Sequence, residues 1–352
     1  MMKVLSIANL SNYGEANTAL HRHRALCKIY PNQVDEFDFK FKFRLINKIF
    51  RKIFLKGFNL SYTGTSLYNK KIIDKVQGNN YEIVWIDKGI FIKPSTLKYI
   101  KDNFPSILII GYSPDEMTQR HNQSADFLAS LEYYDAYITT KSYAIQNLKK
   151  LGAKRVYFVN NAFEPTFHFP RNITKLDIKL LGGDIGFIGT WEQERADSIV
   201  FLAEKGLNIR VWGGGKWLKY KGKYKNLIIE DKGLFSENYS KALVGFKINL
   251  CFLRKINFDQ QTTRSIEIPA SGGFMLAERT AEHLNLFEED KEAVFFDSNE
   301  ELYEQCLYYL NHENERESIR QAGYQKCLDA GYSNEATLAR VLKEILKDHH
   351  AD

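Results

Sequence analysis

Short apolar runs with strand-forming composition alternate along this chain with longer amphipathic stretches. Such alternation is typical of parallel sheets whose strands are connected by helices. In the first half, the apolar runs predict strands at residues 4–10, 83–87, 107–112, 136–140 and 155–159. In the second half, they predict strands at residues 184–188, 209–212, 227–230, 246–251, 274–277 and 293–296. The pattern therefore predicts an α/β protein with two doubly wound sheets.

Local signals place several helix starts between these strands. Ser113 is followed by Pro114 and Glu116, which predicts a helix with Ser113 as its cap, Pro114 in the first turn and Glu116 closing a capping box. Ser298 and Glu301 form the same signal before another helix. Residues 313–347 predict two further helices.

The length of 352 residues, of which 44% are apolar, favours two domains. The strand pattern lapses between residues 166 and 183, where a proline, polar residues and a glycine pair replace it. We therefore expect an N-terminal Rossmann-like domain at 1–165, a linker at 166–183 and a C-terminal Rossmann-like domain with terminal helices at 184–352. Two open sheets in one chain predict a ligand cleft between them, at the carboxyl ends of their strands.

The formal charge of +6 comes from one segment, because residues 39–58 carry seven cations and no acid. Within it, Ile46, Ile49, Phe50 and Ile53 have helical spacing, with lysines and an arginine between them. This pattern fits a helix that lies on an anionic membrane surface. It fits equally a crossover helix that packs its apolar face on the sheet and leaves its cations in solvent. Nucleic-acid binding would require affinity that falls steeply with salt, and we expect no such partner.

The four cysteines are scattered, with no spacing typical of a zinc site or a disulfide framework, which favours a reducing compartment. The apolar run at the N-terminus is too short for a signal peptide, and no segment reaches the roughly 20 apolar residues of a membrane-spanning helix. We expect a cytoplasmic protein. A further hypothesis is that residues 39–58 attach it peripherally to the inner face of the membrane.

The most informative stretch for chemistry is 259–277, where a polar loop leads into a short helix and a glycine pair turns into a buried strand. Arg264 and Glu267 are three residues apart and share a face of that helix. Arg264 can bind phosphate in a bidentate manner, the helix start adds free N–H groups, and Glu267 can accept hydrogen bonds from two hydroxyls. Together they predict a nucleoside diphosphate site. The alternative is an ordinary surface ion pair.

Two glycine-containing loops carry weaker signals. The loop 11–17 contains Gly14, follows the first strand and precedes a helix. The triplet 213–215 precedes Lys216. Neither loop matches the dinucleotide fingerprint G-x-G-x-x-G, which counts against a dehydrogenase.

The stretch 264–282, with 286–287 and 295–297, resembles the C-terminal half of the CgeB-like, spore-maturation-type glycosyltransferases. Residues 186–191 with Arg195, and 209–213, are similar too, and 85–89 and 111–115 match more loosely. These proteins are relatives of the large retaining GT-B superfamily. The resemblance implies a GT-B fold of two Rossmann-like domains facing a cleft, a nucleotide-sugar donor and no bound metal or cofactor.

The resemblance also implies roles for single residues. The superfamily has two acids with seven residues between them, a spacing that Asp259 and Glu267 share, although the first acid is usually Glu. Glu267 would hold the donor ribose and Asp259 would lie near the transferred sugar. Arg195 and Arg264 would neutralise the donor phosphates, because Thr190 stands where a second superfamily arginine usually follows the glycine. The wider set of donor-binding positions is Gly189, Thr190, Trp191, Gly213, Lys216, Gly272 and Gly273.

A retaining reaction needs no side chain to attack the sugar, because arginines and a helix end can stabilise the departing nucleoside diphosphate. An inverting reaction would need a base from the N-terminal half, where the candidates are Asp115, His121 and His21. On the acceptor side we expect Gly14, Asp115 and His121 to face the cleft. The sequence contains no Asp-x-Asp pair or His/Cys cluster for a metal.

The predicted function is sugar transfer from a nucleotide-sugar donor to a glycan or lipid-linked acceptor, in cell-surface polysaccharide or glycoconjugate biosynthesis. Two alternatives stay open. One is a sugar-nucleotide epimerase of the same shape, since fold does not fix function. The other is a non-catalytic nucleotide-sugar-binding or assembly protein.

Overall fold

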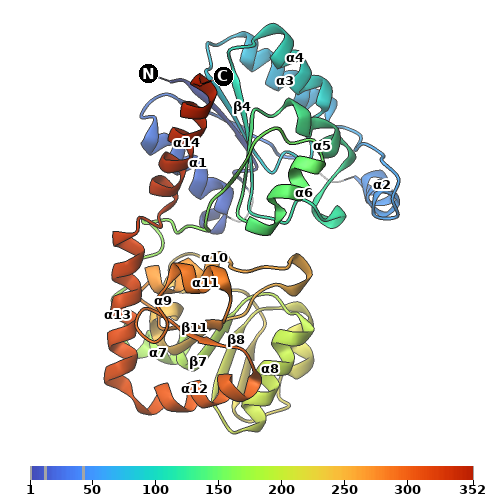
Figure 1. Cartoon of the computed structure of the whole chain (residues 1–352). Coiled ribbons are helices and arrows are strands. Elements are labelled where there is room, and N and C mark those ends of the chain that lie inside the picture. Colours follow the sequence, from blue (N-terminus) through green and yellow to red (C-terminus); the bar gives the residue numbers. More distant parts are fainter. Residues whose placement is uncertain (1, 12–13, 42–43, 352) are drawn as a thin grey trace. The chain divides into compact units, whose positions relative to one another are not determined.

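A computed structural model describes residues 2–11, 14–41 and 44–351 (Figure 1). The chain forms two compact units. Unit 1 comprises residues 1–160 and 334–352, and unit 2 comprises residues 161–333. Among the described helices, none combines the length and apolar character that a membrane-spanning helix needs.

Unit 1 is built on a six-stranded parallel sheet of order β2-β1-β3-β4-β5-β6. Its strands are β1 (Val4–Ala8), β2 (Val34–Asp38), β3 (Ile83–Asp87), β4 (Leu108–Ser113), β5 (Ala136–Thr139) and β6 (Val156–Phe158). Five of them confirm predicted strands. The sequence missed β2 because this edge strand is only partly buried and includes three acids.

Helices cover both faces of this sheet. The helices are α1 (Thr18–Ile29), α2 (Leu45–Leu55), α3 (Ser66–Gln77), α4 (Pro94–Asn103), α5 (Ala125–Ser130), α6 (Ile145–Lys150) and α14 (Asn334–His350). On one face, α1 and α14 bury apolar residues against Val4, Trp85 and Ile110. On the other, α3, α4, α5 and α6 pack on Leu5, Val84 and their neighbours.

Two helix predictions in unit 1 are wrong. No helix starts at Ser113, because β4 continues to that residue and the chain then turns. The Ser113 hydroxyl accepts the N–H of Asp115, and the Glu116 carboxylate accepts the N–H of Thr118, so both side chains form local turns in place of a capping box. The crossover alternative for residues 39–58 also fails, since α2 leaves Ile46 and Ile49 in solvent.

Unit 2 repeats the architecture with a parallel sheet of order β12-β11-β10-β7-β8-β9. Its strands are β7 (Gly183–Ile188), β8 (Ile209–Trp212), β9 (Leu227–Glu230), β10 (Phe246–Cys251), β11 (Met275–Glu278) and β12 (Val294–Phe296). All six confirm the prediction, three of them with the predicted bounds. The unit is thus the second doubly wound sheet that the sequence predicts.

The helices of unit 2 also lie on both faces of the sheet. They are α7 (Lys175–Leu181), α8 (Gln193–Glu204), α9 (Ser236–Gly245), α10 (Thr263–Ala270), α11 (Ala281–Leu286), α12 (Asn299–Asn311) and α13 (Glu313–Asp329). One face carries α8 and α12, and the other carries α9, α10, α11 and α13. Ser298 caps α12 as predicted, by accepting the N–H of Glu301.

The compact units differ from the expected domains, and unit 2 already begins at residue 161. The stretch expected as a linker, 166–183, contains α7, which begins at a capping box of Thr174 and Asp177 and packs with α9. The C-terminal helix α14 belongs to unit 1, although its sequence follows unit 2. The reason is a buried stripe at Leu338, Val341, Leu342 and Ile345, which completes the apolar layer over the unit 1 sheet.

Candidate functional site

In unit 2 the strand order changes direction between β7 and β10, with β8 and β9 on one side of β7 and β11 and β12 beyond β10. Such a switch point leaves an open crevice at the carboxyl ends of the two central strands. Gly189 and Thr190 follow β7 here, and Phe252 and Leu253 follow β10. The candidate site is built around these two strand ends.

Helix α10 begins after the long loop that follows β10, which confirms the helix predicted to carry Arg264 and Glu267. Its N-cap is Thr262, whose side chain accepts the N–H of Ser265, while the N–H of Thr262 donates to Ser265 Oγ. Asp259 lies half-buried in the preceding loop, and its N–H donates to the carbonyl of Arg254. The loop and cap therefore fix where Arg264 and Glu267 emerge.

A buried relay holds the start of α10 against the end of β11. His283 Nδ1 lies 2.6 Å from the carbonyl oxygen of Glu278, so Nδ1 carries the proton. Nε2 of His283 must then accept the hydroxyl proton of Ser265, at 2.7 Å. Both side chains are fully buried, and burial lowers the pKa of His283, which keeps the ring neutral. The Ser–His pair therefore positions α10 and is closed to a substrate.

Glu267 projects from α10 into a nearly closed environment and is 8% exposed. Its Oε2 accepts the hydroxyl proton of Tyr239 at 2.7 Å, and Oε1 lies 3.7 Å from Nε2 of His168. Because Nδ1 of His168 accepts the N–H of Glu164, its Nε2–H faces Glu267. Burial and the charge of Glu267 raise the pKa of Tyr239 well above its usual range.

Arg195, from the start of α8, and Arg264 share the ring of Phe187 on β7. Their guanidinium carbons lie 5.9 Å and 5.7 Å from the ring centroid. Arg195 is 4% exposed and donates to the carbonyls of Leu253 and Thr190. Arg264 is half-buried and donates weakly to the carbonyl of Phe252, at 3.4 Å. Two arginines thus lie together at the carboxyl ends of β7 and β10.

This arginine pair is short of negative charge. Burial and the charge of Arg264 lower the pKa of Arg195 to about 10. Its nearest carboxylate, that of Glu192, is 3.9 Å away and already binds Arg254 at 2.9 Å. Within the described part of the chain, no carboxylate lies within 4 Å of Arg264, and its buried Nε has no hydrogen-bond partner. A partly buried, uncompensated pair of guanidinium groups is suited to bind an anion such as a phosphate.

A pocket of about 650 Å³ adjoins the pair. Its walls come from the residues that follow β7 and β8 and from the loop before α9, and they include Trp191, Trp212 and Phe235. Gly189 lines the pocket and also adjoins the arginine pair, because a Cβ built on it would lie 3.4 Å from Nη1 of Arg264. The volume suits a ligand the size of a nucleoside, and aromatic walls suit the faces of a base.

The predicted residues Thr190, Trp191, Gly213 and Lys216 also line this pocket. Gly213 is required by packing, since a Cβ there would lie 2.3 Å from the carbonyl oxygen of Gly189. Lys216 Nζ lies 4.5 Å from the centroid of Trp191, so this cation covers the pocket wall. The structure therefore brings most of the expected donor-side residues together around one pocket and one arginine pair.

Gly272 and Gly273 lie elsewhere. They end α10 and lead into the amino end of β11, whereas Gly189 follows the carboxyl end of β7 in the same parallel sheet. Gly272 has a φ of +74°, and a Cβ on Gly273 would meet the carbonyl oxygen of Leu243 at 2.8 Å. Tight packing explains this glycine pair, and the structure does not bring it to the pocket.

The expected acceptor-side residues are all in unit 1 but do not form one cluster. Gly14 is exposed in a short 3-10 helix, with open space around its Cα, and residues 12–13 of its loop lie outside the described residues. Asp115 forms an ion pair with Lys88 at 2.5 Å, and its pKa is lowered. His121 lies in another 3-10 helix, where its carbonyl accepts Arg51 of α2. A low pKa makes Asp115 a weak general base.

The first switch point of the chain, between β1 and β3, is already neutralised. Arg22 donates to Asp87 through Nε and Nη2 at 2.6 Å and 3.0 Å, and its guanidinium stacks on Tyr112 at 4.4 Å. His21 is buried beside it on α1. A small apolar pocket of about 130 Å³ opens next to Asp87. At this switch point the arginine of unit 1 is therefore already paired with a carboxylate.

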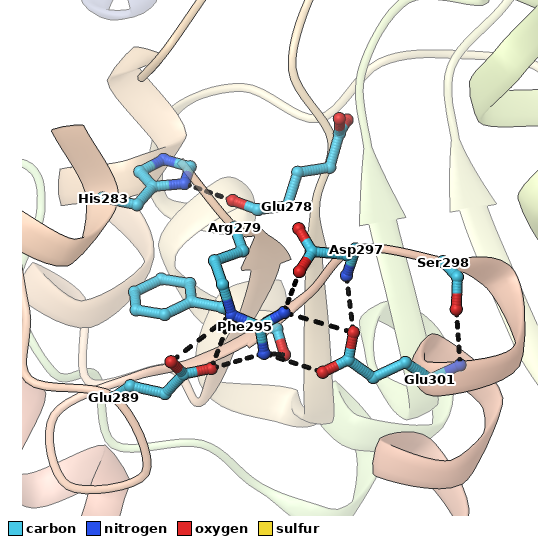
Figure 2. A network of polar contacts seen from close by, with 8 residues as sticks. All are labelled: Glu278, Arg279, His283, Glu289, Phe295, Asp297, Ser298 and Glu301. Atoms are coloured by element: carbon cyan, nitrogen blue, oxygen red, sulfur yellow. Dashed lines mark hydrogen bonds and ion pairs between the residues drawn. The ribbon is translucent and has the colours of Figure 1, made fainter. Parts of the chain in front are cut away.

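Arg279, which directly follows β11, differs from Arg264 in its charge partners. Figure 2 shows its guanidinium surrounded by the carboxylates of Glu289, Asp297 and Glu301 and by the carbonyl of Phe295. These carboxylates raise the pKa of Arg279 above its ordinary value. The cluster ties β11, β12 and α12 together and leaves Arg279 no free charge for a ligand.

Sequence reasoning missed Phe187, Tyr239, His168 and the Ser265–His283 relay. His168 lies far from Glu267 along the chain, and nothing in its local sequence points to that partner. Phe187 falls inside the matched run 186–191, so its position was visible but its role between two arginines was not. Such contacts depend on tertiary packing, which local spacing does not encode.

The C-terminal part of the chain matches a known family. Residues 195–343 fit the family model described as glycosyl transferase-like. No curated protein matches the chain. Within the described ranges, no three or more His, Cys, Asp or Glu side chains are grouped so that they could hold a metal ion.

Solved structures match both units together. Sucrose-phosphate synthase from Thermosynechococcus elongatus covers 100% of both chains with a TM-score of 0.69 at 9% identity. The chain has the GT-B fold. Anabaena Alr3699/HepE in complex with UDP-glucose, another GT-B structure, covers 100% of both chains with a TM-score of 0.63 at 10% identity. A putative UDP-N-acetylglucosamine 2-epimerase from Listeria monocytogenes gives 0.54 at 11% identity, covering 97% of this chain and 94% of that one. The narrower CgeB-like resemblance stays a prediction.

Proposed function

We propose that this GT-B protein is a glycosyltransferase that binds a nucleotide-sugar donor in unit 2. The observation that carries the proposal is the uncompensated pair of Arg195 and Arg264 beside an aromatic pocket of about 650 Å³. The glycosyl transferase-like match begins at Arg195 and includes Arg264, Glu267 and Asp259. A solved protein of the same fold, Anabaena Alr3699/HepE, was crystallised with UDP-glucose.

In this proposal each part of the donor has its own surface. The base enters the pocket between the loops after β7 and β8, where it can stack on an aromatic wall such as Trp191 or Phe235. The diphosphate lies against Arg195 and Arg264, close to Gly189, which has no side chain to block it. Glu267, which accepts the hydroxyl proton of Tyr239 through Oε2, is the carboxylate placed to accept hydrogen bonds from the ribose hydroxyls.

We further propose a retaining, metal-independent reaction. Arg195 and Arg264 stabilise the negative charge of the departing nucleoside diphosphate, and they do so in a partly buried site where electrostatic stabilisation is strong. Asp259 lies in the loop that leads into α10 and would face the transferred sugar. Asp115 is held by Lys88 and has a lowered pKa, which disfavours the base that an inverting reaction would need.

The acceptor is, in this proposal, a glycan or a lipid-linked precursor, and the pathway is cell-surface polysaccharide or glycoconjugate biosynthesis. We place the reaction in the cytoplasm, a reducing compartment, because all four cysteines are free thiols and three are buried.

The test is to incubate the protein with UDP-, GDP-, CDP-, ADP- and dTDP-sugars, with and without glycan and lipid-linked acceptors. Released nucleoside diphosphate and the sugar products would be measured together. We expect one class of donor to release its diphosphate faster when an acceptor is present. Glu267→Gln should weaken donor binding about ten-fold, the cost of one hydrogen bond to a charged group. Arg320→Ala, a change of a partly exposed arginine on α13, is the matched control that should behave as wild type.

Two outcomes would contradict the proposal. A sugar nucleotide that isomerises without acceptor and without release of diphosphate would indicate an epimerase. Binding of a sugar nucleotide with no turnover for any acceptor would favour a non-catalytic binding protein.

A further inference from the structure

Helix α2 attaches to unit 1 through the side that carries Asn47, Arg51 and Phe54. Asn47 is fully buried and exchanges hydrogen bonds with the backbone of Thr63 through both its amide N–H and its carbonyl oxygen. Phe54 is also buried, under the guanidinium of Arg120, which lies 4.0 Å from its ring and donates to its carbonyl. Arg51 donates to the carbonyl of His121. The side of α2 that faces the protein is therefore already satisfied.

The apolar side of α2 faces away from the protein. Leu45 is 75% exposed, Ile49 47% and Ile46 41%, and Phe58 just after the helix is 66% exposed. An amphipathic helix on a soluble domain normally turns these residues toward the core and its polar residues outward. In α2 Leu45, Ile46 and Ile49 do the opposite and face solvent. Figure 1 shows the helix at the periphery of unit 1, away from α1 and α14.

A row of cations runs beside this apolar stripe. Arg44, Lys48, Lys52 and Lys56 follow one another at a spacing of four residues, so they lie on one side of the helix, and all four are exposed. Residues 44–58 contain no acid. Among the described side chains, no carboxylate lies within ion-pair distance of these four cations. Lys42, which belongs to the same basic segment, lies outside the described residues.

We infer that α2 docks unit 1 onto the surface of an anionic lipid bilayer. A bilayer offers both things that this face lacks, namely acyl chains for Leu45 and Ile49 and lipid phosphates for the row of cations. The helix is 11 residues long, about 16 Å, which suits a helix lying in the plane of the interface. The long lysine side chains can reach phosphates while their stems stay apolar. This inference goes beyond sugar transfer and does not depend on it.

Other occupants fit the face less well. In a symmetric dimer through α2, the cation row of one copy would lie near the same row of the other copy, and such like-charge contacts oppose association. Nucleic acid would satisfy the cations but would leave Leu45, Ile46 and Ile49 in water, because phosphates contact charge and not aliphatic chains. Only a lipid surface satisfies the apolar stripe and the cations together.

The experiment is co-flotation of the full chain with vesicles of phosphatidylcholine, alone or with one third phosphatidylglycerol. We expect binding to the phosphatidylglycerol vesicles that weakens as NaCl is raised. Lys48→Gln with Lys52→Gln should lower the partition constant about 25-fold, at about five-fold per cation. Leu45→Ser with Ile49→Ser should lower it more than about ten-fold while leaving the charge unchanged.

Matched controls come from other exposed helices of the same chain. Leu176→Ser with Ile178→Ser on α7 repeats the apolar change, and Lys149→Gln with Lys150→Gln on α6 repeats the charge change. Both controls should float with the vesicles as wild type does. Circular dichroism and thermal melting of every variant separate lost binding from lost folding.

Three results would overturn the inference. One is failure of the folded wild-type protein to float with phosphatidylglycerol vesicles. A second is binding that the α2 variants do not change, which would put the lipid surface elsewhere. The third is vesicle binding unaffected by Leu45→Ser with Ile49→Ser, together with binding of poly(U) RNA that Lys48→Gln with Lys52→Gln abolishes, which would favour nucleic acid.

Discussion

Two arginine clusters lie on unit 2 and have opposite charge balance. Arg279 is surrounded by three carboxylates. Arg195 and Arg264 share the ring of Phe187, and the one carboxylate near the pair, that of Glu192, lies 3.9 Å from Arg195. The first arrangement holds strands and a helix together. The second keeps two positive charges close to each other with little compensation, which costs stability and suits a place where an anion binds. The difference separates an arginine that is fully paired within the fold from a pair that is not.

The same contrast holds between the two switch points of the chain. In unit 1, Arg22 at the switch point is bound by Asp87, and both side chains are almost fully buried. In unit 2, the arginines at the switch point have no comparable partner. Equivalent places in two similar sheets therefore differ in charge balance, and this difference is why we propose the anion site in unit 2.

The largest expected effect is on the buried pair of unit 1. Asp87→Ala leaves the guanidinium of Arg22 buried and unpaired, so we expect the free energy of unfolding of unit 1 to fall by about 3–5 kcal/mol. Urea unfolding followed by circular dichroism measures it. Asp102→Ala, which removes an exposed ion pair on α4, is the control and should change stability by less than about 0.5 kcal/mol. An equal effect of the two changes would mean that Arg22 finds another partner.

A smaller loss is expected in the cluster of Figure 2. Arg279→Ala leaves Glu289, Asp297 and Glu301 facing one another, and we expect unit 2 to lose about 1–3 kcal/mol of stability. Because the carboxylates are partly exposed, the loss should be smaller than for the pair in unit 1. Thermal melting of Arg279→Ala beside Arg320→Ala measures the difference. Identical melting temperatures would show that the cluster contributes little to the fold.

The Ser265–His283 relay predicts a pH dependence of stability. Burial lowers the pKa of His283 below its ordinary value of about 6.5, so in mildly acidic solution the unfolded chain binds a proton that the folded chain does not. The contribution of His283 is complete above pH of about 6.5 and is lost as pH falls toward the lowered pKa.

The measurement is unfolding of wild type and of His283→Asn from neutral to mildly acid pH. Asparagine keeps a donor for the carbonyl of Glu278 but does not titrate. His23, whose pKa is also lowered, stays in both proteins, so the difference reports His283 alone. The variant should lose stability less steeply on acidification. Parallel curves would contradict a neutral, buried His283.

The smallest expected effect separates the two clusters most sharply. Arg264→Ala removes a charge that lies close to Arg195, so in the absence of ligand we expect stability to stay within about 0.5 kcal/mol of wild type or to rise. Arg279→Ala, in contrast, is expected to lower the stability of unit 2. Thermal melting without nucleotide compares them. A clear loss of stability in Arg264→Ala would mean that this arginine, too, belongs to the structural framework.

Much of the fold could be predicted from the sequence because its strands are largely buried on both faces and rich in apolar residues, as in β3, where four buried residues follow one another. The edge strand β2 lacked that signal, since three of its five residues are acids and the strand is only partly buried. The assignment of α14 to unit 1 depends on which sheet its stripe covers, and a stripe of Leu338 and Val341 does not name its partner.

For the candidate site, Arg264 and Glu267 could be found because three-residue spacing on a helix is a local property, and Arg195 was found through the family resemblance. Gly272 and Gly273 were assigned to the donor site but lie away from the pocket, because a turn that packs closely needs glycine just as a ligand loop does. The partners of Glu267, Tyr239 and His168, required the folded chain.

The central claim is that Arg195 and Arg264 bind the phosphates of a nucleoside diphosphate. Calorimetric titration with nucleoside diphosphates and the matching nucleosides tests this claim most directly. We predict saturable binding of one diphosphate at one site per chain, much weaker binding of its nucleoside, and a loss of about 30- to 100-fold in affinity for Arg264→Ala, as expected for hydrogen bonds to a charged group. Arg320→Ala should bind as wild type. Equal affinity of wild type and Arg264→Ala for the diphosphate would contradict the account.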